Sequence, residues 1–291
     1  MDFLRPATWS EALEMKSAHP EALPIWGGTD VMVEINLDHR RPTAIMDLTR
    51  VSELGEWGTD RGRLRVGAGV TYARIIDELG DRIPGLAMAS RTVGSPQIRN
   101  RGSVGGNLGT ASPAGDAHPA LLATDALVEL ASTSGSRLVP ARDFFVGPKR
   151  NAARKDELIA AFLVEPSTGP QQFAKVGTRN AMVIAVCSFS IALDVARRQV
   201  GTGIGSAGPT PIRAAEAETF LQGVLEEQSL WELRKEVNYS AVTRFGELVA
   251  AASRPIDDVR GTAAYRRHAL AVLARRTFTW AWDAYRNMAR A

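Results

Sequence analysis

Two glycine-rich segments hold the residues best suited to chemistry in this chain of 291 residues. The first, WGGTDV, covers residues 26–31, and the second, RGSVGGNLGT, covers residues 101–110. Successive backbone N–H groups in glycine turns form a concave anion site, and the missing Cβ lets a phosphate approach closely. Hydroxyl groups at Thr29, Ser103 and Thr110 can add donors. Either segment alone could be a tight turn, but two with almost no Lys or Arg inside favour a bound diphosphate.

Asp116 follows the second glycine segment. A carboxylate at this place can accept a hydrogen bond from a ribose hydroxyl of a nucleotide ligand. The same residue can instead cap a helix over residues 118–126. The two roles are compatible, so the sequence leaves both open.

A literal G-x-G-x-x-G pattern also occurs, at Gly203, Gly205 and Gly208. In a dinucleotide-binding unit these glycines open into a helix whose N-terminus meets the diphosphate, and an acidic residue ends the next strand. Here two prolines follow at once. We therefore interpret the pattern as a strand ending in a glycine turn, with Thr210 capping a helix that begins at Pro211.

The chain shows no set of side chains that could catalyse a reaction alone, and we predict neither catalytic residues nor metal ligands. Its four histidines are dispersed along the sequence, and no zinc-protease or serine-hydrolase motif occurs. Cys187 lies in an apolar stretch and is expected to be a buried, inert thiol. A chain that binds a phosphorylated molecule yet lacks such groups suggests that a cofactor performs the chemistry.

Composition narrows the class further. The net charge is only +3, and no basic stripe interleaved with aromatic residues indicates nucleic-acid binding. No apolar run reaches the roughly 18–20 residues of a membrane span, and the opening residues do not resemble a secretory signal. The single cysteine excludes an internal disulfide and a cysteine-ligated cluster. A cytoplasmic location is expected.

The pattern of the chain predicts a mixed α/β part up to about residue 175, followed by a smaller α+β domain of an antiparallel sheet with helices. Thr8 and Thr71 are suited to cap helices over residues 9–19 and 72–79. Strands are expected over residues 22–26, 43–49, 63–70, 156–165 and 171–179, with hairpins over 126–141 and 183–208. Four helical segments are expected at the end of the chain, over residues 211–223, 230–237, 239–253 and 262–290.

The last of these helices carries tryptophans and arginines. We expect Trp280 and Trp282 to pack in the core, with an interface as the second possibility. A basic face is expected to be solvated, with a subunit contact as the second possibility; it comprises Arg266, Arg267, Arg275 and Arg276.

Four stretches resemble the FAD-binding medium subunit of the molybdenum hydroxylases, the family of xanthine dehydrogenase and aerobic carbon monoxide dehydrogenase. Residues 26–36 resemble its first FAD loop, A-G-G-T-D-L, and residues 99–126 resemble its second, with T-[IVL]-G-G-N and A-S-P-x-[GS]-D in order. Residues 208–223 and 258–276 are similar to its C-terminal domain. The likeness runs nearly end to end, in the family's order and spacing.

The resemblance implies a fold with two FAD-binding subdomains of the vanillyl-alcohol-oxidase and p-cresol-methylhydroxylase type. A C-terminal α+β domain, an antiparallel sheet with helices, would follow. The implied boundaries are 1–57 and 58–172 for the subdomains and 173–291 for the last domain.

The resemblance also implies which residues hold FAD. The first loop would wrap the diphosphate with Ile25, Trp26, Gly27, Gly28, Thr29, Asp30 and Val31. The second would cover its other side with Ser103, Gly105, Gly106, Asn107 and Thr110. Asp116 would hold the ribose, Ile159 would pack near the adenine or ring system, and Lys175 would approach the flavin. The chain departs from the family at Trp26, where a small residue is common, and at Met182 or Val183, where an Asp is common.

Members of this family pass electrons through FAD, so an oxidoreductase subunit is implied. The implied partners are a small subunit with two 2Fe–2S clusters and a large subunit with the molybdopterin cofactor, in a dimer of heterotrimers. Cys187 alone excludes the branch that carries a further 4Fe–4S cluster on this subunit. The alternatives are a stand-alone FAD oxidoreductase of the same fold and a scaffold subunit without cofactor.

Overall fold

A small parallel sheet opens the chain, and the computed structural model describes residues 1–288. Its strands run in the order β1 (Asp2–Leu4), β3 (Ala44–Asp47), β2 (Leu23–Ile25). Helix α1 (Trp9–Ala18) precedes β2, and the Thr8 hydroxyl accepts a hydrogen bond from the Glu11 N–H at 3.2 Å, which confirms the predicted cap. Helix α2 (Val31–Asn36) leads towards β3, and the short helix η1 (Ser52–Gly55) follows β3.

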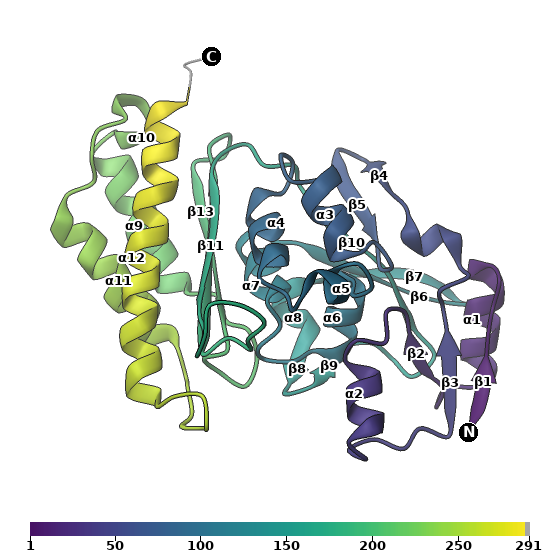
Figure 1. Ribbon diagram of the computed structural model, residues 1–291. Coiled ribbons are helices and arrows are strands. Elements are labelled where there is room, and N and C mark those ends of the chain that lie inside the picture. The colour runs from purple at the N-terminus through teal and green to yellow at the C-terminus, as the bar shows by residue number, and fades with distance from the viewer. Residues whose placement is uncertain (289–291) are drawn as a thin grey trace.

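A five-stranded antiparallel sheet forms the middle of the molecule (Figure 1). Its order is β4 (Trp57–Asp60), β5 (Arg63–Gly67), β10 (Leu158–Val164), β6 (Leu127–Ser132), β7 (Gly135–Pro140). The predicted hairpin over 126–141 is thereby confirmed as β6–β7. Six helices and a small hairpin accompany this sheet: α3 (Tyr72–Glu78), α4 (Pro84–Arg91), α5 (Pro96–Arg99), α6 (Val104–Thr110), α7 (Ala117–Ala123), α8 (Ala141–Phe144), β8 (Phe145–Gly147) and β9 (Arg150–Asn151). As predicted, the Thr71 hydroxyl caps α3.

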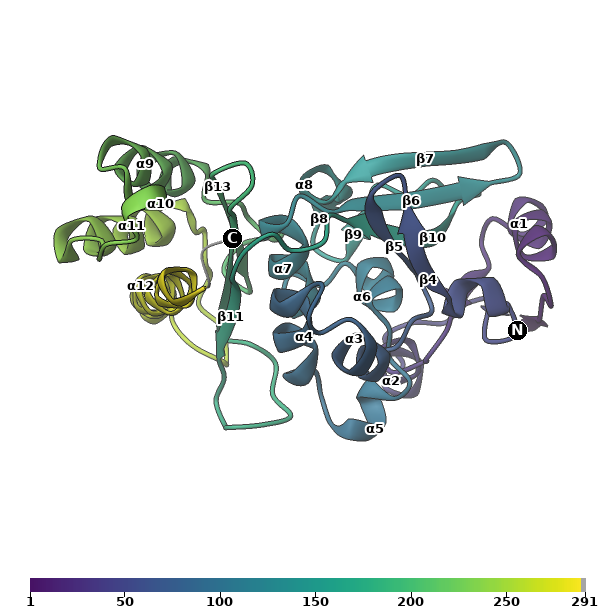
Figure 2. The same cartoon turned by 90° about the horizontal axis from the view of Figure 1, so that it is seen from above.

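The C-terminal part consists of a three-stranded antiparallel sheet and a layer of helices. The strands are β11 (Gln171–Val176), β12 (Cys187–Asp194) and β13 (Gln199–Gly205). The helices are α9 (Ala215–Glu227), α10 (Leu230–Leu233), α11 (Tyr239–Ala252) and α12 (Ala263–Asn287). Figure 2 shows this sheet between two helical layers: α4 and α7 of the middle part cover one face, and α12 packs on the other.

Three hydrophobic clusters match these three parts. Leu108, Phe144 and Phe162 are fully buried in the middle cluster, Phe189 and Phe245 in the C-terminal one, and smaller residues fill the N-terminal one. The boundaries implied after residues 57 and 172 fall inside β4 and β11, and they stay predictions.

The helix expected over 211–223 begins later than predicted. Ile212 and Ile204 exchange backbone hydrogen bonds of 2.8 and 3.0 Å, so the chain after the glycine turn folds back along β13. This pairing delays the helix until Ala215, and the prediction that Thr210 caps it is wrong. Of the segment expected over 230–237, only α10 is helical, because Arg234 adopts a left-handed conformation with φ +52°. Residues 289 and 290 of the last predicted helix lie outside the described residues.

Helix α12 buries one of its two tryptophans and one of its four basic-face arginines, which differs from the prediction made from the sequence. Trp282 is buried and its Nε1 donates to the Lys235 carbonyl at 2.8 Å, whereas Trp280 is 49% exposed, so core packing is wrong for Trp280. Arg266 is buried, which corrects the prediction of a solvated position. Its guanidinium donates to the Ser206 carbonyl at 2.6 Å and to Asp258, because this end of α12 packs on the turn after β13.

Candidate functional site

The two glycine segments lie against each other. Gly27 and Gly28 connect β2 to α2, and Gly28 has φ +72°, which favours glycine. A Cβ on Gly27 would overlap the carbonyl group of Arg101 in the second segment. The close approach of these two backbones therefore requires glycine at position 27.

The second segment follows the short helix α5 and continues into helix α6. The Ser103 hydroxyl accepts a hydrogen bond from the Gly106 N–H at 3.0 Å and caps this helix. Gly105 is packed so tightly on Ala68, the residue after β5, that a Cβ would overlap the Ala68 backbone. A Cβ on Gly106, in contrast, would meet only the Ser103 hydroxyl at 3.4 Å. Gly105 is therefore needed for packing, whereas Gly106 faces open space.

A side-chain hydrogen bond also joins the two segments. The Thr110 hydroxyl donates to the Asp30 carboxylate at 3.0 Å. Asp30 stands at the start of α2 but makes no side-chain cap bond there. Two of the predicted residues, Asp30 and Thr110, are thus in direct contact across the two segments.

Lys175 and Asp116 meet in a buried ion pair. Lys175 Nζ lies 2.6 Å from Asp116 Oδ2, and both side chains are 10% exposed. Lys175 also donates to the carbonyl groups of Thr92 at 2.9 Å and Val183 at 3.1 Å. Burial raises the pKa of Asp116, while Lys175 and the Thr92 hydroxyl act in the opposite direction. Asp116 occupies the N-cap position of α7, as considered in the sequence, but its side chain makes no capping hydrogen bond there.

The apolar residues of the predicted set are placed around the glycine segments. Ile25 ends β2 and Val31 begins α2. The Trp26 ring covers Gly69 and packs on the N-terminal cluster. Ile159 on β10 lies below the second segment, where its Cδ1 would be 3.8 Å from a Cβ on Gly109.

Comparison with known proteins decides the family. Residues 1–165 match the family model described as "FAD binding domain in molybdopterin dehydrogenase". Residues 172–281 match "CO dehydrogenase flavoprotein C-terminal domain". The chain belongs to the FAD-binding medium subunits of the molybdenum hydroxylases. The resemblance noted in the sequence is thereby confirmed.

Relatives and solved structures agree with this assignment. The glyceraldehyde dehydrogenase medium chain of Sulfolobus acidocaldarius is 30% identical over 281 residues, covering 95% of this chain and 96% of the relative. The nicotinate dehydrogenase FAD-subunit of Eubacterium barkeri is 32% identical over 235 residues, covering 76% and 79%. A chain of the reconstituted CO dehydrogenase from Oligotropha carboxidovorans superposes with a TM-score of 0.89 at 25% identity, covering 98% of both chains. The predicted fold is confirmed with it.

Unpartnered polar atoms show that the residues of this medium subunit fit FAD. The Asn107 Oδ1, the Asp116 Oδ1 and the Tyr72 hydroxyl are buried and have no hydrogen-bond partner among residues 1–288. An unsatisfied buried polar group costs about 1–3 kcal/mol, so such atoms at one site point to a polar ligand. Hydroxyl groups of FAD can donate to the Asn107 and Asp116 oxygens, and a hydroxyl or phosphate oxygen of FAD can accept from the Tyr72 hydroxyl.

Tyr72 and His118 lie beside the candidate site, and neither was among the site residues predicted from the sequence. Tyr72 is 3% exposed, and its backbone N–H donates to the Gly102 carbonyl at 3.0 Å. Burial first, and then the Asp116 and Asp30 carboxylates, raise the pKa of Tyr72 well above its ordinary value, so its hydroxyl stays a donor. His118 is fully buried with Nε2 3.1 Å from the Asn107 carbonyl oxygen, and burial lowers its pKa to about 4. No local pattern marks either residue, because their partners come from other elements.

The literal G-x-G-x-x-G pattern serves packing. A Cβ on Gly203 would overlap the backbone of Pro119 in α7, and the neighbouring Gly201 stands in the same way against Ala123. These glycines let α7 lie directly on β13, which explains the pattern without a nucleotide. Cys187, at the start of β12, is buried as predicted, and burial raises its pKa to about 12.

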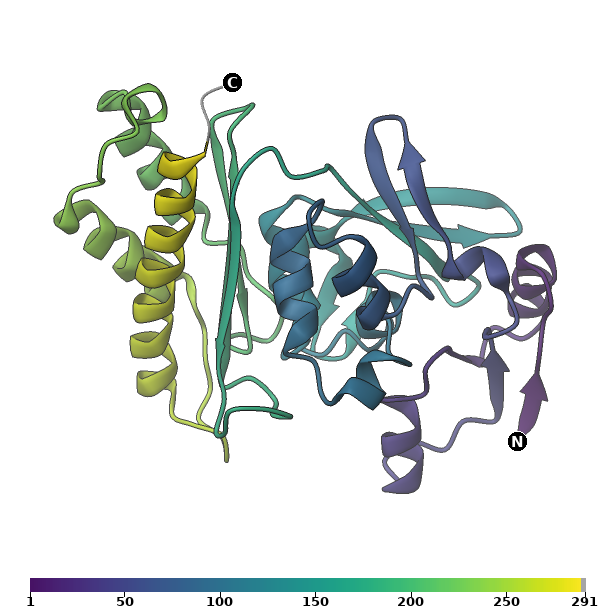
Figure 3. The same cartoon turned by 45° about the horizontal axis from the view of Figure 1, so that its top comes forward.

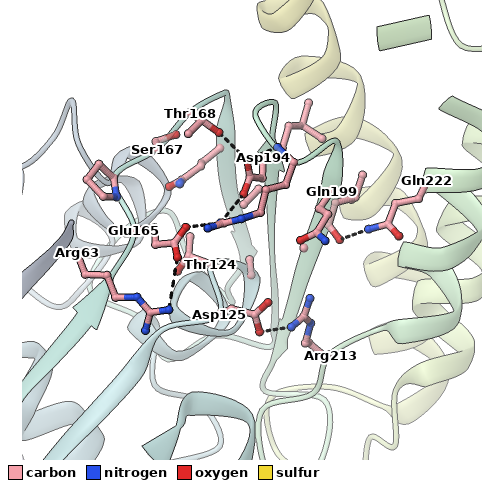
Figure 4. A pocket seen from close by; sticks show the side chains of 18 residues that line it. Arg63, Thr124, Asp125, Glu165, Ser167, Thr168, Asp194, Gln199, Arg213 and Gln222 are labelled. Atoms are coloured by element: carbon pink, nitrogen blue, oxygen red, sulfur yellow. Dashed lines mark hydrogen bonds and ion pairs between the residues drawn. The ribbon is translucent and has the colours of Figure 1, made fainter. Parts of the chain in front are cut away.

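A polar cavity of about 350 Å³ separates the middle sheet from β12 and β13 (Figure 4). Its charged side chains pair with each other: Arg197 with Glu165 and Asp194, and Arg213 with Asp125. None of the predicted FAD residues lines it. Among the described residues that line the cavity, each arginine is paired with a carboxylate, so these side chains offer no free cation to a ligand.

No helix within residues 1–288 combines the length and apolarity that crossing a bilayer requires.

Proposed function

We propose that this chain is the electron-transferring FAD subunit of a heterotrimeric-type molybdenum hydroxylase. It would take electrons from the 2Fe–2S clusters of a small partner subunit and pass them to an external acceptor. The observation that carries the proposal is the contact between the two glycine segments, with unpartnered Asn107, Asp116 and Tyr72 atoms beside it. A site built from backbone and hydroxyl groups suits a cofactor that performs the chemistry itself.

Each part of the site has a role in this proposal. The backbone N–H groups of residues 27–29, 104 and 105 hold the diphosphate, and the N-terminus of α6 favours its negative charge. Asp116 accepts from a ribose hydroxyl, Ile159 contacts an aromatic ring of FAD, and Lys175 approaches the flavin. Bound FAD supplies a centre that takes up electrons and releases them.

The remaining partners are a large subunit with the molybdopterin cofactor and a second copy of the heterotrimer. The names of two matched relatives, "medium chain" and "FAD-subunit", support a multi-subunit enzyme. A cytoplasmic location is part of the proposal, and the single cysteine, which leaves no internal disulfide, is compatible with it.

The decisive experiment is to purify the chain from its natural source under native conditions. We expect absorbance at about 450 nm, release of FAD rather than FMN, and co-purification of an iron–sulfur subunit and a molybdopterin subunit identified by mass spectrometry. A colourless chain that takes up no FAD would contradict the proposal and favour a scaffold subunit. Substrate reduction of the FAD in the isolated chain would instead favour a stand-alone oxidoreductase.

Gly106→Leu provides a test of the site within the chain. Gly106 faces open space, so the apoprotein should fold, but the new side chain would occupy the position proposed for the diphosphate. We expect FAD retention to collapse. Gly223→Leu is the matched control, because Gly223 is also in a helix and a Cβ there meets nothing within 4 Å; it should retain FAD.

A further inference from the structure

The C-terminal helices form a groove that is separate from the predicted FAD residues. Helix α12 and the start of α11 line a hollow of about 920 Å³. Figure 3 shows the two helices side by side, α12 in yellow and α11 in green. None of the predicted FAD residues lines this hollow. We call it the α11–α12 groove; its walls include Tyr239, Val242, His268, Arg275, Arg276 and Trp280.

One face of α12 runs along this groove. Residues four apart in a helix lie on the same face, and four lining residues have this spacing: His268, Val272, Arg276 and Trp280. Asp283 continues the lining towards the end of the helix. At the helical rise per residue, the stretch from His268 to Asp283 is about 22 Å long. The side chains therefore lie on one elongated surface.

The groove is suited to a polypeptide. Tyr239 is 77% exposed and Trp280 is 49% exposed, and His268 and Arg276 are exposed as well. A small-molecule site buries most of its ligand between enclosing walls, which such exposed side chains do not provide. Exposed aromatic side chains and arginines along an elongated surface are instead typical of protein–protein contacts.

The two walls favour a helix as the bound segment. Both walls are helical, and the backbone groups inside a helix are hydrogen-bonded within it. They cannot pair with an added strand, as the free edge of a sheet can. An amphipathic helix that lays its apolar face in a groove needs no such backbone pairing.

Two guanidinium groups at the middle of the groove set the charge of this helix. Within residues 1–288, Arg275 and Arg276 form no ion pair, because the acidic lining residues Glu236 and Asp283 both pair with Arg286. A helix that covers the groove removes water from both guanidinium groups, and a buried charge without a partner is strongly unfavourable. The bound helix must therefore supply carboxylates, which accept charge-assisted hydrogen bonds from guanidinium groups.

A second copy of this chain does not meet this requirement. Most homo-oligomers form about a two-fold axis, which brings the same surface of both copies together. With the axis at the middle of the groove, Arg275 and Arg276 would face their own copies, and like charges repel. The bound helix therefore belongs to a different polypeptide.

We propose that the α11–α12 groove binds an acidic amphipathic helix of a partner subunit. The apolar face of that helix packs on Tyr239, Val272 and Trp280, and its carboxylates pair with Arg275 and Arg276. For Trp280 and for these two arginines, the subunit contact that the sequence left as the second possibility thus becomes the assigned role. The inference rests on the proposed function for the presence of a partner subunit and adds where, and through which chemistry, that subunit binds.

Defined peptides test the charge of the bound helix. Two fluorescein-labelled helical peptides of about 18 residues, long enough to span the groove, carry leucine at every third or fourth position. One has Glu and the other Lys beside the leucines, and fluorescence anisotropy measures their binding to the FAD-loaded full chain. We expect the Glu peptide to bind about tenfold more tightly, with the difference shrinking as salt is added. Equal binding of the two peptides, or binding of neither, overturns the inference.

Variants of the groove test which residues bind the peptide. Arg275→Gln, Arg276→Gln should weaken binding of the Glu peptide about tenfold, and Trp280→Ala should weaken binding of both peptides. Thermal melts establish that the variants fold. The matched control is Arg50→Gln, Arg254→Gln, which removes the same charge from exposed arginines outside the groove and should leave both affinities unchanged. Unchanged affinity of the Glu peptide for the double variant at positions 275 and 276 overturns the inference.

Cross-linking in the native complex identifies the bound segment. Arg276→Lys keeps the positive charge and places an amine in the groove. A carbodiimide joins this amine to a carboxyl group in direct contact; the amide bond forms with loss of water, which converts the carbodiimide into a urea. In the natively purified complex, we expect mass spectrometry to find the amine joined to an Asp or Glu of an amphipathic helix in a partner subunit. Coupling to a second copy of this chain, or only to carboxylates within the chain, overturns the inference.

The same preparation separates this inference from the proposed function. FAD content and subunit composition are measured before cross-linking. A chain that purifies without FAD and without any other protein overturns the proposed function and this inference together. An FAD-loaded complex in which the amine couples to no carboxylate of a partner subunit overturns the inference alone.

Discussion

Lys175 Nζ lies 2.6 Å from Asp116 Oδ2, and this ion pair joins β11 of the C-terminal sheet to the start of α7. The two residues are 59 positions apart in the chain. Both were predicted to contact FAD, one at the ribose and one at the flavin. Their contact means that a buried cation and a buried anion of the candidate site neutralise each other.

Breaking this pair should cost much stability. In Lys175→Met the Asp116 carboxylate stays buried without its cation, and its pKa, already raised by burial, should rise further. We expect a loss of about 3–5 kcal/mol in the free energy of unfolding, measured by urea denaturation. The double variant Lys175→Met, Asp116→Leu should recover most of it, since both buried charges are gone. FAD affinity should not recover; a double variant that binds FAD normally would show that the pair is only structural.

Gly27→Ala should separate the two glycine segments. The added Cβ would overlap the Arg101 carbonyl group, which is backbone and cannot move aside as a side chain can. We expect loss of FAD together with a melting temperature several degrees lower. Gly58→Ala serves as control, because a Cβ on Gly58 meets nothing within 4 Å. An alanine variant at position 27 that retains FAD would contradict the role of this contact.

Tyr72→Phe tests whether the buried hydroxyl serves the ligand. Removing a hydroxyl that has no protein partner should leave the apoprotein as stable as before, or more stable by about 1 kcal/mol. FAD affinity should fall by about tenfold, the effect of one lost hydrogen bond. Fluorescence titration of the deflavinated chain and thermal melts of both forms measure the two effects. Unchanged affinity would mean that the hydroxyl does not contact FAD.

Acid should destabilise the protein through His118. The folded protein keeps this imidazole neutral down to a pKa of about 4, whereas an unfolded histidine takes up a proton near 6.5. Between these values the unfolded state binds the extra proton, so stability is complete above pH 6.5 and falls by roughly 3 kcal/mol towards pH 4. His118→Gln should flatten this decline in urea titrations at successive pH values. The exposed His268→Gln should leave it as it is.

Local sequence signals predicted much of the fold correctly, and the site residues taken from them stay predictions. Thr8 and Thr71 cap the helices they precede, and the hairpin of β6 and β7 forms where alternation predicted it. Such features depend on neighbours within a few residues, so one stretch of sequence contains their cause. The order of the glycine segments likewise sufficed to identify the family, which the comparisons confirm.

The rest depended on contacts between distant parts of the chain. Arg266 can be buried because Asp258 and the Ser206 carbonyl group accept hydrogen bonds from its guanidinium. The helix after β13 starts later than predicted because Ile212 pairs with Ile204 through backbone hydrogen bonds. The buried pair of Lys175 with Asp116 and the unpartnered hydroxyl of Tyr72 arise in the same way. The sequence by itself predicted which backbone segments leave room for a diphosphate, because the missing Cβ is a property of glycine. Only the tertiary structure decided which charges meet, because burial and pairing depend on how separate elements pack.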